Sequence, residues 1–89
     1  MSRETRTQVY VAWLDASFER DIDRAEDASC VLLHTTGWLV REDRQVIAIA
    51  GEIKPADSTS RQMYRDVTTI PKVLIRFRRD RDVRLHGDA

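Results

Sequence analysis

The chain is poor in cysteine, glycine, proline and long apolar runs. Its 89 residues include one cysteine, three glycines and two prolines. One cysteine cannot form an internal disulfide, and so little glycine and proline excludes collagen-like or low-complexity structure. The longest apolar runs, Val9 to Leu14 and Val46 to Ala50, are far shorter than the roughly 20 residues that a membrane-spanning helix needs. The charged first residues predict no secretory signal, so we expect a cytoplasmic protein that does not contact membranes.

The charge balance is neutral overall but uneven along the chain. There are 15 Lys and Arg residues and 15 Asp and Glu residues. Residues 15–27 hold six acids and two arginines, whereas residues 72–84 hold six bases and two aspartates. One interpretation is that the two segments pair with each other, inside one molecule or head to tail between two copies. A dedicated nucleic-acid binder usually carries a basic surplus, which this chain lacks.

Five short β-rich segments, separated by charged or polar turns and loops, predict five β-strands. The first is apolar on both faces, and the last alternates apolar and charged residues. The second is expected to bend or bulge at Gly37, and a short charged turn joins it to the third in a hairpin. In the last, Ile75 and Phe77 are predicted to point inward, and Arg76 and Arg78 outward. The predicted strands are residues 8–14, 29–41, 45–53, 67–70 and 75–78.

This order predicts a mainly β fold, a small five-stranded barrel of the SH3-like or Sm-like kind. A single turn of 3₁₀ helix is expected over Pro71 to Leu74. Residues 16–27 are predicted to form a long acidic first loop that holds a short helix. The predicted organisation is a flexible tail over residues 1–7, a barrel domain over 8–80 and a flexible charged tail over 81–89.

Four motifs resemble a pattern in small, single-domain bacterial and prophage-borne proteins. They are Val9-x-Val-x-Trp13-Leu-Asp-Ala, Gly37-Trp-Leu-Val-x-Glu-Asp43, the run 47–53 and Ile70-Pro-Lys-x-x-Ile75. The resemblance covers roughly residues 9–79 and implies an SH3-like barrel. It supplies no catalytic or binding residue, and the acidic segment 16–27 departs most from it.

No constellation in the chain predicts catalysis, a metal or a cofactor. Cys30 and His34 are the nearest pair of soft ligands, yet on a strand they stand about 13 Å apart, too far to share one zinc ion. We expect a buried thiol and a partly exposed imidazole instead. The only other histidine, His86, lies in the predicted tail. The sequence therefore predicts that the protein is not an enzyme.

Aromatic and charged residues are the candidates for binding. We expect Trp13 in the core, whereas Trp38 follows a glycine and belongs either to the core or to a binding surface. The arginines near the end of the chain either bind phosphates or keep an edge strand exposed to water. Asp80 and Asp82 lie among them and support the second interpretation. The candidate partner-binding residues are Trp38, Arg76, Arg78, Arg79, Asp21 and Asp23.

The function predicted first is a non-catalytic protein-interaction module with an unidentified protein partner, and homo-oligomer formation stays open. The alternative is a small barrel that binds RNA or DNA through Arg76, Arg78 and Arg79. Both rest on fold class and surface chemistry, and fold class alone does not determine function.

Overall fold

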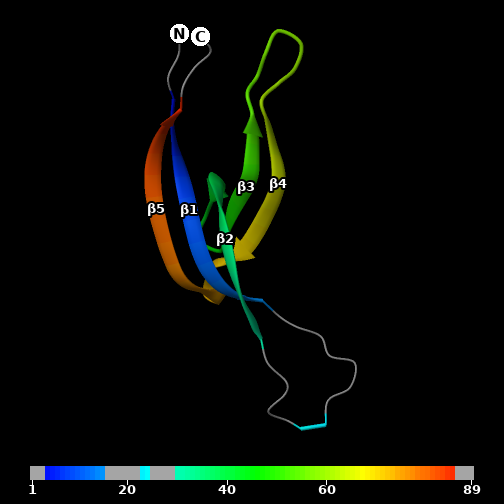
Figure 1. The fold of residues 1–89 in the computed structure, drawn as a ribbon, viewed down its shortest axis with the longest axis vertical. Helices are drawn as coiled ribbons and strands as arrows, with labels where there is room; N and C mark the ends of the chain where they lie inside the picture. Colours follow the sequence, from blue (N-terminus) through cyan, green and yellow to red (C-terminus); the bar gives the residue numbers. More distant parts are fainter. Residues whose placement is uncertain (1–3, 16–22, 25–29, 86–89) are drawn as a thin grey trace.

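The computed structural model describes residues 4–15, 23–24 and 30–85. Within them the chain forms one sheet of five antiparallel strands, ordered β4-β3-β2-β1-β5, and one turn of 3₁₀ helix (Figure 1). The predicted mainly β fold is confirmed. A closed barrel is not shown, because β4 and β5 are the two edges of the sheet along the described residues. The elements are β1 (Glu4–Asp15), β2 (Val31–Glu42), β3 (Val46–Lys54), β4 (Met63–Pro71), η2 (Lys72–Leu74) and β5 (Ile75–Leu85).

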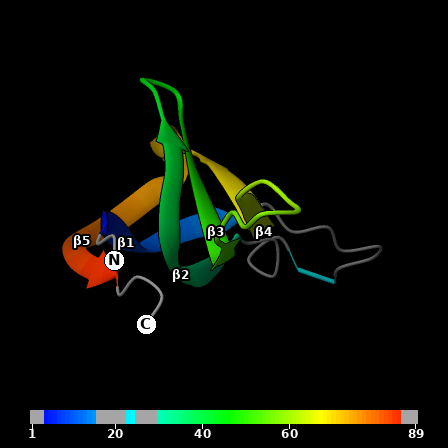
Figure 2. The same cartoon turned by 90° about the horizontal axis from the view of Figure 1, so that it is seen from above.

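The sheet curls around a small apolar core. Figure 2 shows β1 and β5 crossing the β2–β3 hairpin rather than lying flat beside it. The core side chains come from β1, β3 and β4, and none is more than 8% exposed. Trp13 is among them, as predicted, and its indole N–H donates a hydrogen bond to the Thr35 hydroxyl at 2.9 Å. The core residues are Val9, Val11, Trp13, Ile47, Ile49 and Ile70.

Two local predictions are confirmed. The β2–β3 hairpin turns at Asp43, whose carboxylate accepts hydrogen bonds from the backbone N–H groups of Gln45 and Val46 at 2.8 and 2.9 Å. These bonds favour the ionised carboxylate and hold the pKa of Asp43 below its usual value. The 3₁₀ turn follows Pro71, which ends β4.

The strands extend further than the alternation predicts. Residues 4–7 and 82–85, expected within flexible tails, pair with each other from Glu4 opposite Leu85 to Thr7 opposite Asp82. Polar residues satisfy their backbone groups in this ladder although they add nothing to the core. Most of the acidic loop predicted over 16–27 lies outside the described residues.

Gly37 marks the closest approach of β2 to β3. A Cβ atom at this position would lie 2.3 Å from the carbonyl oxygen of Ala50 and 2.7 Å from a methyl carbon of Ile49. The irregularity of pairing comes three residues later, because Leu39 is paired with Ile49 and Arg41 with Ala48. The glycine is therefore needed for space, and the bulge that was predicted there lies at residue 40.

A bulge in β5 changes which of its side chains face the core. Ala12 pairs with Phe77, and Trp13 pairs with Ile75, which leaves Arg76 as an extra residue in β5. Ile75 packs against the core, but Phe77 lies on the opposite side and is 49% exposed. The prediction that Phe77 points inward is wrong, and so is the outward prediction for the half-buried Arg78.

Candidate functional site

Strands β5, β1 and β2 turn one side away from the core, and we call it the outer face. Successive side chains of a strand point to opposite sides, so residues that alternate with the core residues of β1 lie on this face. The register of β1 with its neighbours assigns the remaining positions. The outer face comprises Gln8, Tyr10, Ala12, His34, Thr36, Trp38, Phe77, Arg79 and Arg81.

Three rings meet at the centre of the outer face. The ring centroids of Tyr10 and His34 are 5.9 Å apart with their planes at 13°, and the Tyr10 hydroxyl is hydrogen-bonded to Nδ1 of His34 at 2.7 Å. Phe77 approaches Tyr10 from the other side, again at 5.9 Å between centroids. His34 is exposed and Phe77 is half-exposed, so flat ring surface is available to a ligand.

Two exposed arginines stand beside these rings. The guanidinium carbon of Arg79 lies 5.6 Å from the Phe77 ring centroid, within the range of a cation–π contact. Arg79 and Arg81 also line a cleft of about 220 Å³ whose floor includes Tyr10. The other lining residues are Gln8 and Thr36. The cleft thus combines an aromatic ring, two cations and two uncharged polar groups.

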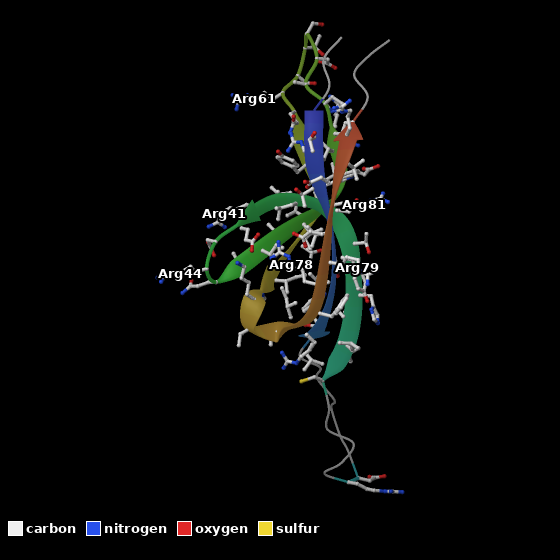
Figure 3. All side chains as sticks on the ribbon, turned by 90° about the vertical axis from the view of Figure 1, so that its left-hand side faces the viewer. Arg41, Arg44, Arg61, Arg78, Arg79 and Arg81 are labelled. Carbon is white, nitrogen blue, oxygen red and sulfur yellow. The ribbon has the colours of Figure 1, made fainter. Side chains whose placement is uncertain are left out.

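Alternation along β5 separates two of its arginines from its aspartates. Arg79 and Arg81 lie on the outer face, whereas Asp80 and Asp82 lie on the opposite side of the strand. Figure 3 shows Arg78 on one side of β5 and Arg79 and Arg81 on the other. None of the nine outer-face residues is acidic. A domain of zero net charge therefore has a locally basic aromatic surface.

Arg78 belongs to an internal ion cluster. Its guanidinium donates two hydrogen bonds to the Glu42 carboxylate, at 2.8 and 2.9 Å, and binds Asp80 at 2.8 Å. Lys72 forms a second ion pair with Glu42. Hydrogen bonds from Arg78 and then Lys72 lower the pKa of Glu42 to about 2. The cluster holds the end of β2 against β5, so this predicted partner-binding arginine is already engaged.

Trp38 lines a second cavity, of about 310 Å³, beside the outer face. The indole is half-buried and sits opposite Gln8 of β1 and Ala50 of β3. Polar side chains from β3 and β4 complete the cavity. Its lining residues are Trp38, Gly51, Glu52, Ile53, Lys54 and Arg65. The predicted choice between core and surface is thus resolved in favour of a partly accessible ring.

Of the remaining predicted residues, those that the structure describes do not join the outer face. Arg76 is exposed and donates to the carbonyl oxygen of Val73 at 3.0 Å. Asp23 is exposed, and Asp21 lies outside the described residues. Cys30 is exposed, so the expectation of a buried thiol is wrong. Over residues 4–15, 23–24 and 30–85, no three His, Cys, Asp or Glu side chains gather in a way that suits a metal ion.

Sequence reasoning missed most of the outer face, naming only Trp38 and Arg79. Tyr10 could have been identified from the sequence, because this residue alternates with the core valines of β1. Phe77 was not, because the bulge that moves it outward depends on pairing with a distant strand.

No known family model, curated protein or solved structure shows significant similarity to this chain. In the part of the chain that the structure describes, no helix has the length and hydropathy to cross a membrane. The function must therefore be argued from the surface chemistry itself.

Proposed function

We propose that this protein is a non-catalytic small β-domain that binds single-stranded RNA or DNA through its outer face. The observation that carries the proposal is the separation of charge on β5, which leaves Arg79 and Arg81 beside exposed rings with no acid among the outer-face residues. This reverses the order of the two functions predicted from the sequence. The neutral net charge of the chain was the argument against nucleic-acid binding. The outer face is locally basic, so the net charge does not describe it.

The chemistry of single strands matches the outer face. Every base has a π-face that stacks on an aromatic side chain, and the phosphates attract guanidinium groups. Tyr10, His34 and Phe77 provide the rings, while Arg79 and Arg81 follow Phe77 two and four residues later along β5. A duplex hides its base faces, so the accessible rings favour single strands.

We also propose that the curled sheet is a small barrel of the SH3-like kind. The strand order and the 3₁₀ turn between the last two strands support this assignment. Small barrels commonly bind ligands on a sheet face, and the oligonucleotide-binding folds are an example.

Fluorescence anisotropy with labelled RNA and DNA 12-mers tests the proposal. Two phosphate contacts on a single strand predict a slope of about −1.4 in log K against log salt. Affinity should then fall about sevenfold between 50 and 200 mM salt. Binding to a duplex of the same sequence should be weaker. No salt-sensitive binding at micromolar protein refutes the proposal and returns a protein partner to first place.

Matched variants separate the outer face from general charge. Arg79→Gln with Arg81→Gln should abolish most of the salt dependence. The control pair, Arg44→Gln with Arg61→Gln, removes the same charge from exposed sites away from Arg79 and Arg81 (Figure 3). The control should bind as the unchanged protein does, and an equal loss in both pairs contradicts the assignment.

The stacking contribution has its own test. Phe77→Ala should weaken binding about tenfold, because stacking of one base contributes about 1–3 kcal/mol. Val73, which is 79% exposed on the 3₁₀ turn, supplies the control substitution Val73→Ala. Unchanged affinity in the Phe77 variant would remove that ring from the site.

A further inference from the structure

The Trp38 cavity adjoins the outer face and offers chemistry that the outer face lacks. Trp38 stands opposite Gln8, which also lines the arginine cleft, so the two sites share a border. Tyr10 pairs with Thr36, which makes Trp38 its diagonal neighbour, about 7–8 Å away between Cα atoms. A single-stranded nucleic acid that stacks one base on Tyr10 can therefore place its next base, or the one after that, on Trp38.

Two charged side chains of the cavity place a hydrogen-bond acceptor, Glu52, beside a hydrogen-bond donor, Arg65. Glu52 and Arg65 are cross-strand partners, and their closest charged atoms are 4.0 Å apart, too far for a direct hydrogen bond. Both side chains are more than half exposed, so each keeps hydrogen-bonding capacity for a ligand. The other cation, Lys54, is already bound to the Ser60 hydroxyl at 2.7 Å.

We propose that the Trp38 cavity is a guanine-selective subsite for the bound single strand. An ionised carboxylate only accepts hydrogen bonds, and its two oxygens match two adjacent N–H donors. Guanine is the one common base whose Watson–Crick edge carries such a pair, at N1 and N2, next to an acceptor at O6. Glu52 takes the two donors, Arg65 donates to O6, and the indole of Trp38 stacks on the ring. The cavity volume of about 310 Å³ is at the small end of ligand sites.

This inference rests on the proposed function, and a base-substitution series tests it. The ligands are uridine octamers in which one internal position is U, A, C or G. The octamer with G should bind about tenfold more tightly than the other three, within the range of a bidentate base contact. Tryptophan fluorescence should report the event, because Trp38 is accessible while Trp13 is 8% exposed.

Two variants assign the effect to the cavity. Glu52→Gln should reduce the preference for G to less than twofold, measured against the affinity of the same variant for the all-U octamer. Asp82→Asn removes the same charge from the other side of the sheet and should keep the preference. Glu52 is 64% exposed in its side chain, so its replacement does not threaten folding. Trp38→Phe should remove the ligand-dependent fluorescence change.

Guanosine 5′-monophosphate, compared with the adenosine nucleotide, separates the two proposals. Equal binding of the four octamers, or a preference that survives in the Glu52 variant, overturns the guanine subsite while the proposed function stands. Selective quenching by the guanosine nucleotide without binding of any octamer supports the cavity and overturns the proposed function. No response to any of these ligands overturns both.

Discussion

Replacing Gly37 by alanine should lower the free energy of unfolding by about 2 kcal/mol. The new Cβ would lie 2.3 Å from the carbonyl oxygen of Ala50, where contacts under 3.0 Å are essentially never seen, so β2 and β3 must separate by about 0.7 Å. Overpacking costs about 1–3 kcal/mol, and we expect the upper end because the obstructing atom is backbone. The stiffer unfolded chain offsets about 0.4–1 kcal/mol of this cost.

Gly51→Ala is the matched control for this substitution. Its nearest neighbour would be the side-chain Cβ of Asp66 at 3.3 Å, and no described glycine has a positive φ. Stability should therefore change by no more than about 0.5 kcal/mol. Urea unfolding followed by tryptophan fluorescence measures both variants, and the Gly37 variant should also melt about 8–16 °C lower. Equal midpoints for the two variants would refute the reasoning.

Two further predictions concern the ion cluster at the end of β2. Glu42→Gln should cost about 1 kcal/mol at pH 7, a value reduced for the partial exposure of the pair. The pKa of Glu42 is lowered from 4.5 to about 2 in the folded state, so its contribution is complete above pH 4.5 and lost as the pH falls toward 2. Urea unfolding at stepped pH should show the two proteins converging in acid, and a constant difference argues against the ion pairs. Arg78→Gln should lower the free energy of unfolding by about 1–2 kcal/mol, because Glu42 and Asp80 lose their shared cation. The control Arg76→Gln changes an exposed arginine and should change thermal stability little. A similar loss in both arginine variants contradicts the assignment of Arg78 to the cluster.

Local signals predicted the parts of the fold that depend on neighbouring residues. The apolar run from Val9 to Leu14 predicted a strand, and Trp13 within it is buried as expected. The charged turn at Asp43 predicted the hairpin because its carboxylate binds its own backbone two and three residues later. The proline at position 71 predicted the end of β4.

Signals that depend on distant partners were misread. Residues 4–7 are polar and suggested a tail, yet they form a ladder with the end of β5. Their pairing is driven by backbone hydrogen bonds to a strand about 75 residues away, which leaves no mark in local hydropathy. Whether the two edge strands pair and close the sheet also depends on residues far apart in the sequence, so local patterns do not predict it.

The sequence by itself determined that the chain is mainly β, that Trp13 belongs to the core and that basic residues gather near β5. Only the tertiary structure decided which arginines share a face. Side chains along a strand alternate with period two, so the single extra residue at Arg76 reverses the assignment of the residues that follow it relative to Ile75. That shift directs Arg78 toward Glu42 and leaves Phe77, Arg79 and Arg81 exposed together. The bulge forms against β1, far away in the sequence, which is why a neutral composition concealed a basic aromatic surface.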